Sequence, residues 1–138
     1  MIEIKNIHKS YGSLEVLKGI DAVIEQGEIV SIVGASGAGK TTLLQIVGTL
    51  DKPDYGEILY DGRRVDNLPD REMARFRNGN IGFVFQSYNL MAGLSGIENV
   101  AMPLMFRGMD KDRRTRIAKE MLREVGLGNR MKHKPTQM

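Results

Sequence analysis

The chain has 138 residues and no cysteine, and its 20 Lys and Arg residues against 17 Asp and Glu residues give a formal net charge of +3. This length suits about one ordinary domain with a buried core, and the absence of cysteine excludes disulfides and a thiol nucleophile. The charges are mixed, so no basic block indicates a nucleic-acid partner. No apolar run approaches the roughly 18 residues of a membrane-spanning helix, so any membrane association is expected to be peripheral.

Two strands are predicted before the first glycine-rich loop. Residues 2–12 read IEIKNIHKSYG, which indicates a strand that ends at an aromatic residue, Tyr11. Residues 15–28 read EVLKGIDAVIEQGE and predict a second strand that leads into the loop.

A phosphate-binding loop is the most specific motif. Residues 29–33 read IVSIV, typical of a strand buried on both faces, and residues 34–41, GASGAGKT, match G-x-x-x-x-G-K-[ST]. A mostly apolar helix follows and should stop before Asp51. Glycines let backbone N–H groups point at phosphate oxygens, and the helix N-terminus adds its positive end. The predicted nucleotide-binding residues here are Gly34, Ser36, Gly37, Ala38, Gly39, Lys40, Thr41 and Thr42, with Lys40 on the β- and γ-phosphates and Thr41 on Mg²⁺.

Downstream, residues 56–65 read GEILYDGRRV, a strand run that meets the tight-turn pair Asp61–Gly62. Asp61 could be taken for a catalytic aspartate after a strand, but Gly62 stands where a glutamate would be needed. The pair therefore predicts a turn. Residues 81–86 read IGFVFQ, a second buried apolar run that ends at Gln86.

Residues 94–98 read LSGIE, and they predict the start of a helix. Ser95 and Glu98 have the S-x-x-E spacing of a capping box, in which each residue satisfies a backbone N–H of the other. Ile97 would obstruct close approach of a phosphate to the backbone. We therefore expect Ser95 to cap a helix and not to bind nucleotide.

Residues 98–109, ENVAMPLMFRGM, carry flexible thioether side chains suited to a partner helix, although core packing is an open alternative. Pro103 should kink or break a helix here. Residues 112–127 predict a further helix. Its apolar face is expected to comprise Ile117, Met121, Leu122 and Val125.

The order of these motifs resembles the ATPase subunit of ABC transporters, specifically the lipoprotein-release and macrolide-export branch. The resemblance covers residues 1–138, and its most specific parts are the phosphate loop, IGFVFQ, and ENVAMPL at residues 98–104. It implies an α/β P-loop NTPase fold with an N-terminal antiparallel β portion and the start of a helical subdomain. One incomplete domain is expected, with a nucleotide-binding core at residues 1–85 and the glutamine loop and helical start at residues 86–138.

The resemblance also implies roles for individual residues. Tyr11 would stack on adenine, with packing as an edge-strand tyrosine as the alternative. Gln86 would contact Mg²⁺ and the attacking water, with an exposed strand-end glutamine as the alternative. Catalytic roles would thus fall to Gln86 and Lys40, and metal contacts to Thr41 and Gln86, with ATP and Mg²⁺ as cofactors.

The partners implied by the resemblance are a transmembrane permease, whose short cytoplasmic helix would meet residues 98–109, and a second copy of the full-length ATPase. The expected location is cytoplasmic, at the inner face of the cell membrane.

The family's signature motif and its strand ending in Asp-Glu would both lie beyond residue 138. We therefore expect the runs at residues 29–33 and 81–85 to lack neighbouring strands. The chain alone should bind ATP–Mg weakly and should not hydrolyse it. A non-hydrolysing nucleotide-binding fragment or regulatory module stays open as an alternative, whereas a DNA-repair or translation ATPase is disfavoured by ENVAMPL and its flanks.

Overall fold

The chain begins with a long antiparallel hairpin formed by β1 (Ile2–Tyr11) and β2 (Leu14–Ile24), with Tyr11 opposite Leu14 beside the turn. On its other side β1 pairs with β3 (Tyr55–Tyr60), which pairs with the short β4 (Arg63–Arg64). The sheet therefore has the order β2-β1-β3-β4 and is antiparallel throughout. Both predicted N-terminal strands are confirmed.

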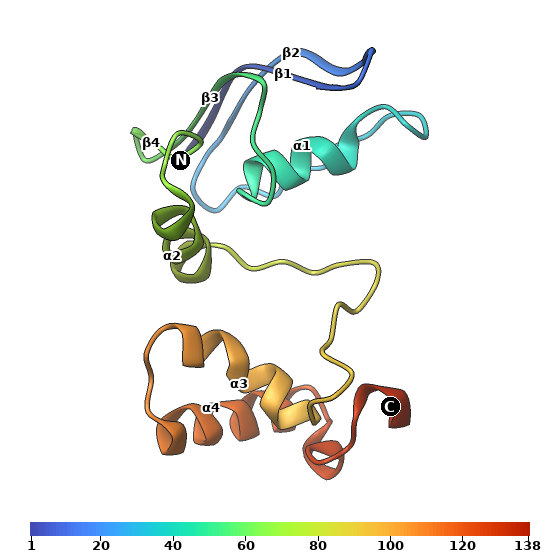
Figure 1. The fold of residues 1–138 in the computed structure, drawn as a ribbon, viewed down its shortest axis with the longest axis vertical. Helices are drawn as coiled ribbons and strands as arrows, with labels where there is room; N and C mark the ends of the chain where they lie inside the picture. The colour runs from blue at the N-terminus through green and yellow to red at the C-terminus, as the bar shows by residue number, and fades with distance from the viewer. The chain divides into compact units, whose positions relative to one another are not determined.

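Helix α1 (Lys40–Val47) packs against this sheet (Figure 1). Ile46 from the helix meets Ile7, Ile58 and Val65, and all four side chains are fully buried. Burial of each such side chain contributes about 1.5–3 kcal/mol, so this cluster is the main source of cohesion in this part of the chain. The helix ends at Gly48, as predicted from the residues that follow it.

The turn between β3 and β4 is the one predicted from Asp61 and Gly62. Both residues have positive φ, 48° and 77°, the combination that a two-residue turn with the twist of a hairpin requires. The Asp61 carboxylate therefore sits at the tip of the β3–β4 hairpin, immediately after β3.

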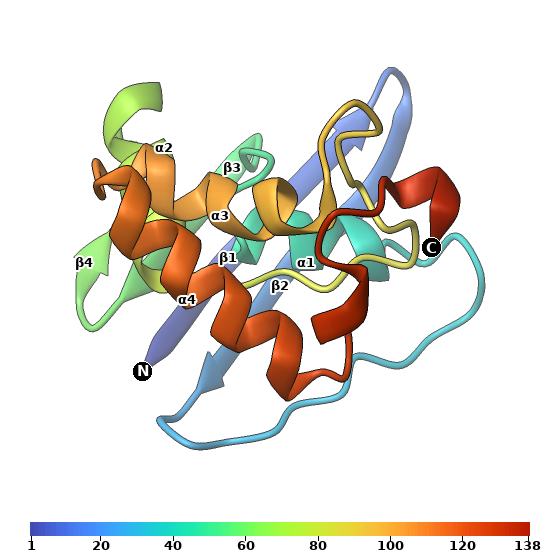
Figure 2. The same ribbon diagram turned by 90° about the horizontal axis from the view of Figure 1, so that it is seen from below.

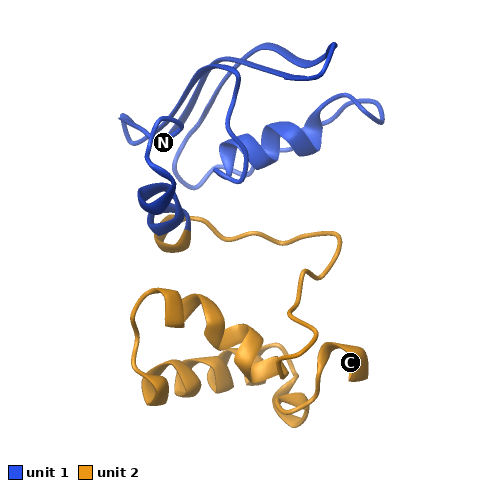
Figure 3. Ribbon diagram, in the orientation of Figure 1, with its two compact units in different colours: residues 1–77 blue, residues 78–138 orange.

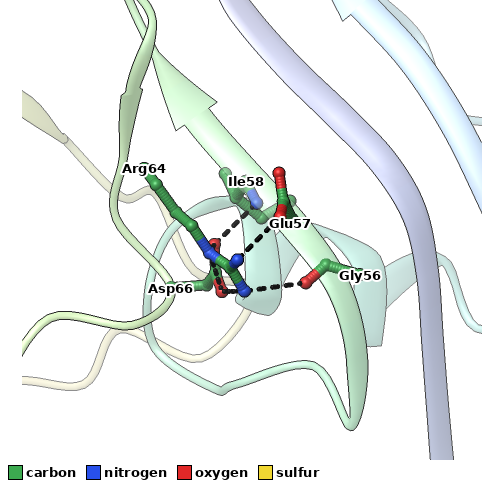
Figure 4. A network of polar contacts seen from close by, with 5 residues as sticks. All are labelled: Gly56, Glu57, Ile58, Arg64 and Asp66. Carbon is green, nitrogen blue, oxygen red and sulfur yellow. Dashed lines mark hydrogen bonds and ion pairs between the residues drawn. The ribbon is translucent and has the colours of Figure 1, made fainter.

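One arginine joins β4 to β3 (Figure 4). Arg64 donates to Asp66 through Nε and Nη2 and to Glu57 at 2.7 Å, and it reaches the carbonyl of Gly56 at 3.3 Å. Asp66 in turn accepts the backbone N–H of Ile58 at 2.8 Å. The two-residue strand β4 can make few backbone hydrogen bonds to β3, and the contacts of the Arg64 guanidinium add to them.

The structure is a computed structural model that describes residues 1–138, and it divides them into two compact units (Figure 3). Unit 1 is Met1–Arg77 and unit 2 is Asn78–Met138. The boundary falls within α2 (Asp70–Asn80), a helix that the sequence analysis did not predict. Asp70 and Glu72 in its first turn and Arg77 in its last turn complement the helix dipole.

Unit 2 is built on α3 (Gly96–Phe106) and α4 (Lys111–Glu124), which pack against each other (Figure 2). The predicted apolar face of α4 is only partly right. Leu122 is buried, but Met121 and Val125 are 43% and 69% exposed, and the buried neighbour is Ala118, whose small side chain permits close approach of the helices. Two 3₁₀ turns follow at Gly128–Arg130 and Pro135–Gln137. None of the helices has the length and hydropathy needed to cross a membrane.

Pro103 was expected to kink or break a helix, and the break does not occur, because α3 runs through this residue and ends at Phe106. Proline removes one helical N–H, so the carbonyl of Asn99 loses its regular donor. Packing of α3 against α4 maintains the helix, and the Pro103 carbonyl still accepts from Arg107 N–H at 3.3 Å and from the Asn78 side chain at 3.1 Å.

The LSGIE segment is the helix start that the capping-box spacing predicts. Ser95 is the N-cap of α3 and has extended backbone angles. Its N–H donates to Glu98 Oε2 at 2.8 Å, and its hydroxyl donates to the same oxygen at 2.5 Å. The Ser95 hydroxyl and then its N–H hold the pKa of Glu98 below its usual value.

The first N–H groups of α3 already have acceptors within the chain. Gly96 N–H donates to the carbonyl of His133 at 2.8 Å, and Ile97 N–H donates to that of Met131 at 2.9 Å. A Cβ on Gly96 would lie 2.8 Å from Met138 Cε, so the segment is closely covered by the residues after α4. These donors are therefore not available to a phosphate.

The two buried strands predicted at residues 29–33 and 81–85 are not formed. Ile29, Val33 and Val84 are 96%, 87% and 101% exposed, and neither segment belongs to the sheet. A strand requires a backbone partner, and no other strand pairs with either run. Both runs are apolar, which is why strands were predicted there. An apolar run forms a buried strand only if another strand pairs with it, and neither run has such a neighbour.

Replacing Ser95 by Ala should lower the free energy of unfolding by about 1 kcal/mol, because α3 loses its N-cap hydroxyl. Urea unfolding would measure this, with Ser87→Ala, outside any helix or strand, as the control. Because Ser95 lowers the pKa of Glu98, the wild-type advantage should be present above the ordinary Glu pKa and be lost as pH falls through the lowered one. Loss of nucleotide binding without loss of stability would contradict this assignment.

Candidate functional site

The phosphate loop, residues 34–39, joins the extended segment 29–33 to α1 within unit 1. Gly37 and Gly39 have φ of 79° and 83°, a region that other residues enter only with strain. These two glycines let the backbone curl between the end of an extended run and the first turn of a helix. Of the predicted strand–loop–helix context, the loop and the helix are present, and the strand at residues 29–33 is not formed.

Gly39 sits directly against the hairpin. A Cβ at this position would lie 2.8 Å from Leu17 Cδ2, 2.9 Å from Val16 Cγ1 and 3.1 Å from the Val16 carbonyl oxygen. No side chain fits there. The same residue is the N-cap of α1, and its carbonyl accepts the N–H of Leu43 at 2.8 Å. Close packing on β2 therefore sets where the helix begins.

Lys40 follows immediately, and its side chain folds back across the loop. Its Nζ donates to the carbonyl of Gly34 at 2.8 Å and to that of Ala35 at 2.6 Å. The ammonium group thus lies over the beginning of the loop, at Gly34, which is six residues before Lys40 in the sequence. A positive charge held there is well placed to meet an anion in the concave side of the loop.

The N-terminus of α1 leaves several donors open. Lys40, Thr41 and Thr42 form its first turn, where backbone N–H groups have no acceptor within the helix. Gly39 offers no side-chain cap, and no acidic residue lies in the first turn to offset the positive end of the helix dipole. Thr41 is exposed and Thr42 is half-buried. These features leave backbone donors and the positive end of the helix dipole available to an anion.

Tyr11 is the last residue of β1 and is 49% exposed. Its hydroxyl donates to Asp51 Oδ2 at 3.0 Å, and Lys9 Nζ lies 5.6 Å from the centre of its ring. The hydroxyl of Tyr11 is therefore anchored, while about half of the side chain stays accessible to solvent. An aromatic ring in this state could stack on a nucleotide base.

Asp51 and Lys9 form a charged pair beside Tyr11, 3.2 Å apart. Burial raises the pKa of Asp51, but hydrogen bonds from Lys52 N–H, Lys9 and Tyr11 outweigh it, so the pKa lies below its ordinary value. Burial lowers the pKa of Lys9, whereas Asp51 and the charge of Asp54 raise it more. The two shifts agree that both groups are ionised.

Gln86 lies in unit 2, in an exposed segment outside helices and strands. Just before it in the chain, Phe83 and Phe85 stack with ring centres 5.3 Å apart. The glutamine side chain is open to approach from solvent.

Asn99 of α3 organises the residues that follow Gln86. Its Oδ1 accepts the N–H of Met91 at 2.8 Å, and its Nδ2 donates to the carbonyls of Met91, Leu94 and Ser95. One side chain therefore ties residues 91–95 to the helix. Sequence reasoning treated ENV only as a family landmark and missed this role, although Asn99 lies only four residues after the predicted N-cap, Ser95.

The predicted ligand side chains suit a Mg²⁺ ion that is bound mainly by phosphate oxygens and not one that is enclosed by protein ligands. No three His, Cys, Asp or Glu residues are grouped to hold a metal. Thr41 and Gln86, the two predicted ligands, supply neutral oxygen atoms. Mg²⁺ usually takes one or two protein ligands and completes its shell with phosphate oxygens and water, so the hydroxyl of Thr41, in unit 1, is the kind of single ligand that the ion takes beside a triphosphate.

Unit 2 carries an exposed apolar surface on α3. Met105 and Phe106 are 45% and 72% exposed, and a cleft of about 290 Å³ lies beside them. The residues lining this cleft are Leu94, Glu98, Ala101, Met102, Met105 and Arg114. Residues 98–109 were predicted to face either a partner or the core. Met105 and Phe106, at the end of α3, are not core residues.

A family model described as ABC transporter matches residues 17–138. The chain is 51% identical over 138 residues to the lipoprotein-releasing system ATP-binding protein LolD of Bacteroides thetaiotaomicron, and 48% identical to that of Porphyromonas gingivalis. Each alignment covers 100% of this chain and 63% of the relative.

Among solved structures, the chain is similar to the dimeric structure of MJ0796, a bacterial ABC transporter cassette, with a TM-score of 0.92 and 40% identity. The same cassette in a post-hydrolysis state bound to ADP and Pi gives a TM-score of 0.91. Both comparisons cover 100% of this chain and 63% of the other. The chain thus spans less than two thirds of the length of these relatives.

Alanine substitutions at the two loop glycines should differ in their effect on stability. Gly37→Ala adds only left-handed strain, about 1–2 kcal/mol, because no atom lies within 4 Å of its added Cβ. Gly39→Ala should cost about 1–3 kcal/mol more, because its Cβ would also overlap β2. Urea unfolding of both variants tests this, and equal losses would show that the contact of Gly39 with β2 does not hold the loop.

Proposed function

The chain belongs to the ABC transporter family, and from this membership we propose that it is part of an ATP-binding subunit that drives lipoprotein release or export through a transmembrane partner. Its fold is the N-terminal portion of the P-loop ATPase of that family, with an antiparallel sheet and the first helices of a helical subdomain, as the sequence predicted. Residues 1–85 would act as the nucleotide-binding core, and residues 86–138 would supply the glutamine loop and the start of the helical subdomain.

The observation that carries the proposal is the phosphate loop with its surroundings. Gly39 packs on β2, the first N–H groups of α1 lack acceptors, and the Lys40 ammonium lies across the loop carbonyls. Backbone donors and one positive charge converge on a space that suits phosphate oxygens. Binding of a nucleoside triphosphate is the function that these features support best.

Each candidate residue then has a distinct role. Lys40 would leave the Gly34 and Ala35 carbonyls and neutralise the β- and γ-phosphates, while the backbone of residues 34–39 and the Thr42 hydroxyl hold the phosphate oxygens. Thr41 and Gln86 would hold Mg²⁺, which when bound neutralises charge on the β- and γ-phosphates. Gln86 would also orient the attacking water, and Tyr11 would stack on adenine.

Hydrolysis requires a group that polarises the attacking water, and we propose that this chain alone does not turn ATP over. Asp61, which directly follows β3, sits in a hairpin turn with Gly62. A second copy of the full-length ATPase would complete the site in operation, and the similar cassette MJ0796 has a dimeric structure.

We propose that the exposed end of α3 receives a short helix of the permease and so places the protein at the inner, cytoplasmic face of the cell membrane. Met105 and Phe106 offer the apolar contact, and the adjoining cleft contains one acidic and one basic residue, Glu98 and Arg114. Flexible thioether side chains adapt to a partner's shape. Leu94 lines the same cleft, and it belongs to residues 91–95, which Asn99 ties to α3 and which follow Gln86 in unit 2.

Replacing Lys40 by Ala should weaken ATP–Mg binding about thirtyfold or more, the equivalent of roughly 2 kcal/mol for a charge-assisted contact. Equilibrium dialysis with labelled ATP measures this, with Lys119→Ala on the exposed side of α4 as a matched control for charge. Equal affinities of wild type and Lys40→Ala would overturn the assignment. ATP turnover by the 138-residue chain would refute the proposed lack of hydrolysis and exclude the non-hydrolysing alternative.

Replacing Phe106 by Asp should reduce co-purification with the cognate permease at least tenfold, because a charge would be buried against the partner's apolar helix. Val125→Asp, on a residue 69% exposed in the same unit, should have little effect. Binding of ATP should be unchanged in both variants. Equal permease binding by both would place the docking surface elsewhere.

A further inference from the structure

A short chain of polar contacts holds the Tyr11 side chain. The hydroxyl of Tyr11 donates to Asp51 Oδ2 at 3.0 Å, while Asp51 Oδ1 accepts from Lys9 Nζ at 3.2 Å and from Lys52 N–H at 2.8 Å. Lys9 also donates to the Lys52 carbonyl at 2.6 Å, and its side chain is only 11% exposed. We call Lys9, Asp51 and Tyr11 the aromatic clamp.

The clamp is fixed to the backbone on two sides. Lys9 and Tyr11 are two residues apart on β1 and so project from the same face of that strand. Asp51 follows α1, and its N–H and that of Leu50 both donate to the carbonyl of Gln45 in that helix, at 3.3 and 2.8 Å. The tyrosine hydroxyl is therefore connected through Asp51 to the helix that begins at the phosphate loop.

The clamp also lies next to the loop itself. Lys9 pairs across the hairpin with Leu17, and Leu17 is one of the side chains that Gly39 touches. Directly paired residues in antiparallel strands have Cα atoms about 4.5–5.5 Å apart. In Figure 1 the hairpin tip and the phosphate loop lie at the same end of unit 1. A triphosphate in the loop would thus carry its nucleoside toward Tyr11.

We propose that Asp51 is a positioning residue, which orients the ring of Tyr11 before a nucleotide base stacks on it. This inference rests on the function proposed above. A half-exposed tyrosine without an anchor would have to lose side-chain freedom when a base stacks on it. The anchored hydroxyl removes that loss beforehand, and this preorganisation strengthens binding. Neither Asp51 nor Lys9 needs to touch the nucleotide.

The experiment compares ATP–Mg with inorganic triphosphate–Mg, which has no base, by calorimetric titration of the 138-residue chain. Tyr11→Phe keeps the ring but removes its anchor, and Asp51→Ala removes the acceptor. Each should weaken ATP binding about fivefold, the value of one hydrogen bond, and change triphosphate binding less than twofold. Asp51→Asn retains an oxygen acceptor and should recover most of the ATP affinity.

The double variant Tyr11→Phe/Asp51→Ala should bind ATP no more weakly than the single variants, because both act through one contact. Equal losses for ATP and triphosphate, additive losses in the double variant, or a Tyr11→Phe protein with wild-type ATP affinity would each overturn the role of Asp51. If triphosphate does not bind to wild type, or binds equally to Lys40→Ala, the proposed nucleotide function fails with it. If triphosphate binds in a way that depends on Lys40 and one of the contrary results above is also found, only the positioning role of Asp51 is overturned. The proposed nucleotide function then stands.

Discussion

The contact between Gly39 and β2 is the constraint on which the candidate nucleotide site depends. A left-handed backbone and the absence of space for a Cβ occur at the same residue, so the loop can close only where it touches Val16 and Leu17. That contact sets the first turn of α1 and therefore the place of Lys40 and Thr41. It also brings the loop beside the strand that carries Tyr11, because Leu17 pairs with Lys9.

The apolar core of unit 1 makes this arrangement rigid. Ile46 of α1 is buried against Ile7 and Ile58, which belong to strands on either side of the sheet's central pairing. The helix is thus held along its length by packing and at its beginning by Gly39. Asp51 adds a polar tie after its end. Three kinds of interaction, steric, apolar and ionic, therefore fix a single helix against a single hairpin.

Unit 2 follows a different logic. Its first helix uses its N-terminal donors internally, since Gly96 and Ile97 donate to the carbonyls of His133 and Met131. The start of α1 in unit 1 has open donors, whereas the start of α3 has none to offer. Ser and Gly occur in both segments, so composition does not distinguish them. Backbone hydrogen bonding does, because only the start of α1 leaves its N–H groups available to an anion.

Local patterns in the sequence were sufficient for the glycine-rich loop before α1, the two N-terminal strands, the turn at Asp61 and the cap at Ser95, because each depends on residues close together in the chain. The tertiary structure decided the rest. Whether the run at residues 29–33 becomes a strand depends on a neighbour, and the contact of Asp51 with Tyr11 joins residues 40 positions apart. The close approach of Gly39 to β2 likewise required the folded hairpin. Spacing determines which groups are available, but distance in space determines which of them meet.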